Sequence, residues 1–132
     1  MSMDALTENQ LDHLRHLLDQ REAALRSHLQ QESDAREEYV QVASEAPDPG
    51  DASFATLSID LGNAAVGRDL AELRGIAGAR RRIERGEYGE CVLCGDEIPY
   101  ARLTAQPTAE RCAPCQHTFE RTHAEGGSRS FL

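Results

Sequence analysis

The amino-acid sequence predicts a mainly α protein: a long antiparallel helical hairpin (coiled coil) that carries a small cysteine-rich domain and a short C-terminal helix. Three observations predict this fold. Two long segments show the apolar spacing of helices, a turn rich in proline and glycine separates them, and two C-x2-C pairs follow. We expect the hairpin at 1–86 with its tip at about 46–53, a four-cysteine zinc-finger domain with the short helix at 87–124, and a disordered tail at 125–132.

Composition limits what the chain can bind. Its 132 residues include 23 acidic and 14 basic ones, which gives a formal net charge of −9, and 39% of the residues are apolar. Negative charge along most of the chain opposes contact with a phosphate backbone, so we expect no direct sequence-specific DNA binding. The N-terminus has no basic segment followed by an apolar run, and no 18 consecutive residues are apolar. We therefore expect a soluble, cytoplasmic monomer without membrane contact.

The first long helix is predicted over residues 7–43, which contain no proline or glycine. Leucines recur there at spacings of three, four and seven, as on one face of an amphipathic helix. These leucines are Leu11, Leu14, Leu18, Leu25 and Leu29. Thr7 followed by Gln10 is typical of a capping box that begins such a helix. At 1.5 Å per residue, roughly 37 residues reach about 55 Å, which is too long for a compact domain of this size.

The second long helix follows a turn at 46–51, where two prolines and a glycine disfavour a continuous helix. Its apolar residues approximate a seam, with a slip between Ala64 and Leu70. The seam residues are Phe54, Leu57, Leu61, Ala64, Leu70, Leu73, Ile76 and Ile83. Gly86 and Gly89 are predicted to end the helix. Two helices joined by a short loop pack as an antiparallel hairpin.

Four cysteines form the strongest chemical signal in the sequence. They are Cys91, Cys94, Cys112 and Cys115, and 17 residues separate the two C-x2-C pairs. This spacing is typical of a tetrahedral zinc site, and four sulfur ligands leave no position for an activated water, so we expect one structural Zn²⁺ rather than a catalytic one. Gly95 suits the tight turn after the first pair. A thiol redox switch, an iron–sulfur cluster and replacement of one cysteine by His117 are the alternatives.

No catalytic constellation is apparent elsewhere, so we predict that the protein is not an enzyme. The histidines of the first helix, His13, His16 and His28, lie among charged neighbours and are expected to face solvent. One basic cluster ends the second helix and consists of Arg80, Arg81, Arg82 and Arg85. These arginines can compensate the helix dipole and aid solubility, or they can dock to an acidic surface of a partner.

The turn of the hairpin carries two acidic residues. Asp48 is a natural N-cap, Pro49 a natural first helical residue, and Asp51 an acid favoured in the first turn by the helix dipole. Such capping also fixes the direction of both carboxylates. A narrow hairpin with an acidic end suits a deep cavity that contains a cation.

The acidic turn, the long hairpin and the run GECVLCGDEIPYARLTAQPTAERCAPC together resemble the DksA/TraR family of bacterial transcription factors. The resemblance covers residues 4–124. It implies a non-enzymatic regulator that enters the secondary channel of RNA polymerase and modulates promoter open-complex stability. The tip motif of the family, D-x-x-D-x-A, corresponds here to Asp48, Asp51 and Ser53, so a serine stands where alanine is expected. A hydroxyl at that position can retune contact with the polymerase.

The resemblance also bears on ppGpp, the alarmone of the stringent response, which family members bind partly through basic residues. The corresponding positions are Gly75, Gln106 and Gln116, and none supplies a cation to a pyrophosphate. We therefore expect little or no ppGpp binding. Two other kinds of function remain open from the sequence: a zinc-stabilised adaptor that engages another protein, and a thiol-based redox sensor.

Overall fold

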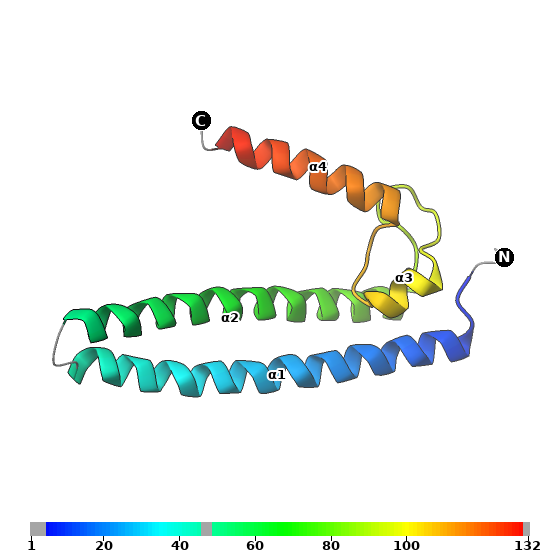
Figure 1. Cartoon of the computed structure of the whole chain (residues 1–132). Helices are drawn as coiled ribbons and strands as arrows, with labels where there is room; N and C mark the ends of the chain where they lie inside the picture. Colours follow the sequence, from blue (N-terminus) through cyan, green and yellow to red (C-terminus); the bar gives the residue numbers. More distant parts are fainter. Residues whose placement is uncertain (1–4, 46–48, 131–132) are drawn as a thin grey trace. The chain divides into compact units, whose positions relative to one another are not determined.

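The computed structural model describes residues 5–45 and 49–130, without the side chains of residues 43, 49, 51, 52 and 124–130. It contains the helices α1 (Glu8–Glu45), α2 (Pro49–Glu84), α3 (Tyr100–Ala105) and α4 (Ala113–Ser130) (Figure 1). The described residues form no strand, and an isolated antiparallel bridge joins Glu90 to Glu97. The predicted mainly α fold is confirmed. None of the described helices is both long and apolar enough to cross a membrane.

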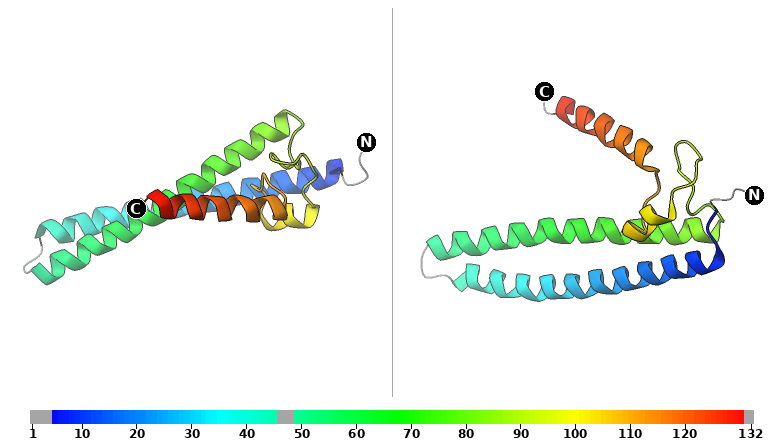
Figure 2. Two further views of the ribbon diagram at one scale, coloured as in Figure 1. Left: turned by 90° about the horizontal axis from the view of Figure 1, so that it is seen from above. Right: turned by 45° about the vertical axis from the view of Figure 1, so that its right-hand side comes forward.

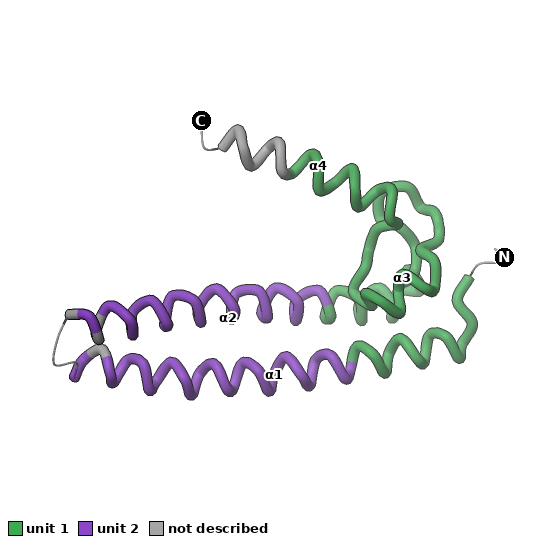
Figure 3. The backbone as a smooth tube through the Cα atoms, viewed as in Figure 1, with its two compact units in different colours: residues 1–18, 76–132 green, residues 19–75 purple. Residues whose placement is uncertain are grey.

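The chain divides into two compact units (Figure 3). Unit 1 comprises residues 1–18 and 76–132, and unit 2 comprises residues 19–75. Unit 1 combines the beginning of α1 and the end of α2 with the loops and helices that follow, so these segments share one core with the cysteine-rich segment. The domain boundary at residue 86 stays a prediction.

The core of unit 1 is apolar and draws on all of its segments. Its fully buried side chains include Leu14 of α1, Ile76 of α2 and Leu103 of α3. The predicted capping box begins α1, because the Gln10 N–H donates to Thr7 Oγ1 at 3.1 Å and the Thr7 N–H donates to Gln10 Oε1 at 3.0 Å. Two otherwise unpaired backbone N–H groups are satisfied in this way.

The end of α2 is fixed by a glycine in the left-handed region. Gly86 has φ 72°, the Glu87 N–H donates to the carbonyl of Arg82 at 2.8 Å, and the Gly86 N–H donates to that of Ile83 at 3.1 Å. These two hydrogen bonds form a Schellman motif, which closes the last turn of the helix. The helix end predicted from Gly86 is thus confirmed.

Unit 2 consists of α1 and α2 segments that run side by side in opposite directions (Figures 1 and 2). The seam predicted for α1 is confirmed at Leu25, which is buried, but the seam predicted for α2 is wrong over much of its length. Phe54, Leu57 and Leu61 are exposed, and Ala64 and Leu70 are also exposed.

The residues of α2 that turn toward α1 recur at alternating spacings of four and three without a slip. They are Ala55, Ile59, Gly62, Val66, Asp69, Leu73 and Ile76. A continuous 3.5-residue repeat keeps one seam facing the partner helix, which explains why this register is preferred. This register places the small residues Ala55 and Gly62 between the helices. At Gly62 an added Cβ would lie 3.0 Å from Glu32 Oε2, so the Glu32 side chain of α1 lies against this glycine.

Polar pairs join the two helices of unit 2. Arg21 forms a bidentate ion pair with Glu72, in which the Nη2–Oε1 distance is 2.8 Å. Arg36 Nη1 donates to Asn63 Oδ1 at 3.2 Å. Among the described side chains of this unit, only Leu25 and Ala55 are buried. Polar contacts between the helices therefore accompany a thin apolar seam in unit 2.

The last helix, α4, is longer than we expected. It begins at Ala113, and its helical backbone continues to Ser130, through the segment that we expected to be disordered. Arg111 lies in the loop before α4, and its guanidinium carbon is 3.6 Å from the ring centroid of Phe119 in the helix. This cation–π contact anchors the first two turns of the helix to the loop that precedes it.

Candidate functional site

The first cysteine pair lies in a tight loop of unit 1. The Cys91 N–H donates to the carbonyl of Asp96 at 2.8 Å, and the Gly95 N–H donates to the carbonyl of Cys91 at 3.0 Å. Gly95 has φ 78°, a conformation that side-chain-bearing residues rarely adopt, so glycine is needed where the loop turns back. The predicted role of Gly95 is confirmed. The loop presents both sulfurs on one side.

The second pair stands at the beginning of α4. Cys112 directly precedes the helix and Cys115 lies in its first turn, where the Gln116 N–H donates to the carbonyl of Cys112 at 2.9 Å. The Val92 N–H donates to the carbonyl of Glu110 at 2.9 Å. This hydrogen bond joins the first loop to the segment that precedes the second pair. Backbone hydrogen bonds therefore bring the two pairs together.

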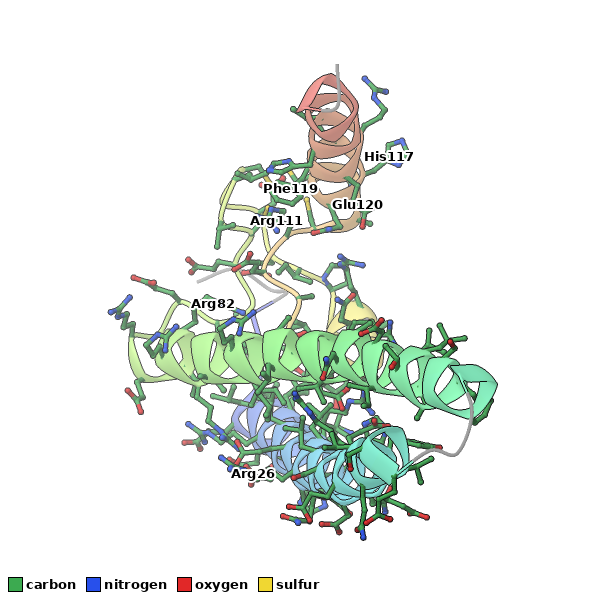
Figure 4. The ribbon with its side chains drawn as sticks, turned by 90° about the vertical axis from the view of Figure 1, so that its left-hand side faces the viewer. Arg26, Arg82, Arg111, His117, Phe119 and Glu120 are labelled. Carbon is green, nitrogen blue, oxygen red and sulfur yellow. The ribbon has the colours of Figure 1, made fainter. Side chains whose placement is uncertain are left out.

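The four predicted ligands converge on one point. Their sulfur atoms all lie within 4.8 Å of one another, and Cys94 Sγ lies 3.7 Å from Cys112 Sγ. A tetrahedral ion with Zn–S bonds of about 2.3 Å requires sulfurs about 3.8 Å apart, so these residues fit zinc. His117 is exposed and projects outward from α4 (Figure 4). The converging set among the described residues is the four cysteines, without His117.

The environment of the sulfurs favours a bound cation. Burial raises the pKa of the Cys91 thiol, but the backbone N–H groups of Cys94 and Cys112 favour its thiolate and bring its pKa down to about 6. The Cys115 thiol donates hydrogen bonds to the sulfurs of Cys112 and Cys94, which stabilise its protonated form and raise its pKa to about 12. Crowded thiols thus resist losing all their protons together. A divalent cation relieves this resistance, because it favours each thiolate.

The cysteine-rich segment is attached to the end of α2 by polar contacts. Arg82 rises from α2 toward the loops (Figure 4), with Nη2 3.4 Å from the carbonyl oxygen of Thr108 and Nη1 3.5 Å from Glu110 Oε2. The Tyr88 hydroxyl donates to the carbonyl of Pro107 at 2.7 Å. Burial raises the pKa of Tyr88 to about 12, so this hydroxyl keeps its proton and remains a donor.

Two arginines near the sulfurs have structural partners. Arg102 Nε donates to the carbonyl of Arg111 at 3.0 Å. Arg111 pairs with Glu110 at 3.1 Å and covers Phe119, as Figure 4 shows. No residue spacing predicts these contacts, because each depends on the folded loop rather than on a helical repeat.

The structure describes only part of the predicted tip. Asp48 lies outside the described residues, and for Asp51 the structure gives the backbone, in the first turn of α2, but not the side chain. Pro49 is the first residue of α2, as predicted. Ser53 lies on the first turns of the same helix with an exposed side chain.

The predicted basic cluster does not form a single surface. Arg81 and Arg85 are exposed, whereas the Arg82 side chain is 14% exposed and contacts the cysteine-rich segment. Arg80 is partly exposed. The exposed pair, Arg81 and Arg85, is the part of the cluster that remains accessible to a partner.

Fold and site together define a helical-hairpin protein with a four-cysteine zinc finger. The model of the prokaryotic dksA/traR C4-type zinc finger matches residues 86–121. The RNA polymerase-binding transcription factor DksA of Escherichia coli K12 is 34% identical over 118 residues, which cover 87% of this chain and 74% of that protein. The chain therefore belongs to the DksA/TraR family. Its cofactor is one structural Zn²⁺.

Two further comparisons found similar proteins. An "Uncharacterized protein" of Aquifex aeolicus is 33% identical over 105 residues, or 80% of this chain and 72% of that protein. The structure of transcription factor DksA2 from Pseudomonas aeruginosa matches with a TM-score of 0.78 at 23% identity and covers 94% of this chain and 93% of that one. The second match concerns the fold alone. It supports a DksA-type coiled-coil fold.

Proposed function

We propose that this protein binds bacterial RNA polymerase through the secondary channel and modulates the stability of promoter open complexes, as a cytoplasmic regulator without catalytic activity. The observation that carries the proposal is the 34% identity to a protein named as an RNA polymerase-binding transcription factor, over 87% of this chain. The acidic balance of the chain favours action through a protein rather than through DNA sequence.

The effector residues that we propose are Asp48, Asp51 and Ser53, at the turn between α1 and α2. Pro49 as first helical residue supports a helix N-terminus there, which favours negative charge. Carboxylates carried on such a turn can approach a bound metal ion in the polymerase. Zinc has a structural part in this scheme: it stabilises the loops that receive Arg82, and hence the junction of hairpin and finger.

We further propose that regulation depends little on ppGpp. Gln116 is already engaged, since its Nε2 donates to Glu120 Oε1 at 3.0 Å and its Oε1 lies 3.5 Å from Arg111 Nη1. Gln106 is exposed but neutral, and Gly75 has no side chain. None of these three positions offers the charge-assisted hydrogen bonds with which proteins hold a pyrophosphate.

The test is transcription in vitro with purified RNA polymerase and a promoter whose open complex is short-lived. We expect the wild-type protein to change open-complex lifetime several-fold, and by the same factor with or without ppGpp. The double variant Asp48→Asn/Asp51→Asn should still bind the polymerase but lose the effect on lifetime. Ser53→Ala tests the departure from the family motif and should change the size of the effect while binding persists.

Three results would contradict the proposal. Absence of polymerase binding by the wild-type protein rejects the partner. Unchanged regulation by the double variant rejects the acidic tip. A large additional effect of ppGpp rejects independence from the alarmone. The charge-neutral change Gln41→Asn, on the exposed surface of α1, is the matched control and should leave regulation intact.

A further inference from the structure

Three large apolar side chains lie together on the outer side of α2, turned away from the seam with α1. Phe54, Leu57 and Leu61, here called the apolar stripe, are 68%, 56% and 64% exposed. Spacings of three and four residues place them on one side of the helix. On the same turns, Ala55 is fully buried and Gly62 approaches α1. The hairpin therefore has its own seam and leaves its largest apolar side chains in this region uncovered.

The sequence around the apolar stripe is strongly acidic. Between residues 32 and 63 the sequence has eight acidic residues and one basic residue, Arg36, which donates to Asn63. Asp60 is exposed and lies three residues from Leu57, within reach of the stripe. An apolar centre with a charged rim is the usual anatomy of a protein interface. Here the described charge at the rim is negative, at Asp60.

This charge decides between the possible occupants. A second copy of the chain would bring the same acidic rim against itself, and like charges facing each other oppose association. Three side chains on one helix also supply little of the ~800 Å² that each partner buries in a standard interface. A positively charged partner avoids the repulsion between like charges. Attraction between the two rims also adds to the small apolar contact.

We infer that the apolar stripe docks on a surface of RNA polymerase that has apolar side chains at its centre and arginine or lysine at its rim. The inference rests on the proposed function, because that function supplies the partner. It adds a second contact to the acidic turn, on a different part of α2. Burial of the stripe supplies affinity, and the acidic rim steers approach and makes binding sensitive to salt.

Binding to purified RNA polymerase, measured as Kd by biolayer interferometry, tests the inference. The triple variant Phe54→Ala/Leu57→Ala/Leu61→Ala removes the apolar stripe. Alanine has the highest helix propensity, so we expect α2 to remain helical. We expect its Kd to rise at least tenfold. The matched control is Leu70→Ala, on the same helix, since Leu70 is 43% exposed but lies roughly 160° around the helix from Phe54. It should bind within twofold of wild type.

A second variant tests the rim. Asp60→Arg should weaken binding at low salt and reduce the dependence of Kd on salt concentration, while circular dichroism remains unchanged. A triple variant that binds within twofold of wild type, or a Leu70→Ala variant that loses as much affinity, would overturn the inference and leave the proposed function standing. Wild-type protein that does not bind polymerase overturns both. Self-association in sedimentation velocity that the triple variant lacks would identify a second copy as the occupant.

Discussion

His28 of α1 and Asp69 of α2 are joined across the hairpin of unit 2 by a short contact between Nδ1 and a carboxylate oxygen. The other ring nitrogen of His28 lies 3.4 Å from Glu32 Oε1. The histidine thus bridges two carboxylates, although 46% of its side chain is exposed. We expected this residue to face solvent only. No helical spacing in one chain segment reveals a partner 41 residues away.

The His28 bridge predicts a dependence of stability on pH. The hydrogen bond and charge of Asp69 raise the pKa of His28 above 6.5, and Glu32 acts in the same direction, whereas Arg21 opposes them. A raised pKa in the folded state means that the stabilisation is complete below pH 6.5 and is lost as the pH rises through the raised value. The thermal midpoint of wild type should therefore fall toward that of His28→Asn as the pH rises above 6.5.

His16→Asn is the control for this prediction, because His16 is exposed on α1 outside unit 2. This variant keeps His28 and its two carboxylate partners, so its thermal midpoint should show the same fall with rising pH as that of wild type. A constant gap between wild type and His28→Asn from pH 5.5 to 9 would show that protonation of His28 does not stabilise the hairpin.

Removal of the metal should unfold the zinc finger. Structural zinc sites contribute folding free energy directly, with apparent binding of roughly 10–16 kcal/mol in small zinc modules. We expect Cys112→Ser, or treatment with a strong chelator, to abolish stoichiometric zinc and the ordered environment of Tyr88, monitored by near-ultraviolet circular dichroism. His117→Asn is matched to it, since it removes the other candidate ligand and should keep one zinc per chain. Loss of zinc in His117→Asn would mean that the ligand set is not four sulfurs.

Two glycines should respond to alanine in opposite directions. Gly67 lies in the exposed part of α2 with nothing within 4 Å of an added Cβ, so Gly67→Ala should stabilise the protein by roughly 0.5–1 kcal/mol through helix propensity. Gly86 has equal space but φ +72°, so Gly86→Ala should destabilise by roughly 1 kcal/mol. Urea unfolding measures both. Equal signs for the two variants would contradict the proposed roles of propensity and backbone conformation.

The sequence predicts a feature correctly where its residue pattern has a single structural interpretation. The leucines of α1 repeat on a single face, and four cysteines in two close pairs have few uses outside metal binding. Gly86 and Gly95 mark positions of positive φ, and the structure has both in that region. These features are local, so they can be read from neighbouring residues.

The seam of α2 could not be found in the same way. Phe54, Leu57 and Leu61 are large apolar residues at helical spacing, so they predict the buried face. Ala55 and Gly62, which face inward, are too small to give the same signal. Register in a hairpin depends on both helices at once, and the polar pairs Arg21–Glu72 and His28–Asp69 contribute to it. At the metal site, the sequence predicted the ligands but not Arg82 as a contact between α2 and the loops, because that contact depends on the folded path of the chain.

A thin seam also bears on how unit 2 can change over generations. Only Leu25 and Ala55 are buried there among the described side chains, and most substitutions at exposed helix positions change stability by less than about 0.5 kcal/mol. Folding therefore places few demands on the outward residues of this segment. Selection can act on them almost entirely through what they bind, so relatives with different partners, or different affinities for one partner, can diverge on this surface while keeping the same hairpin.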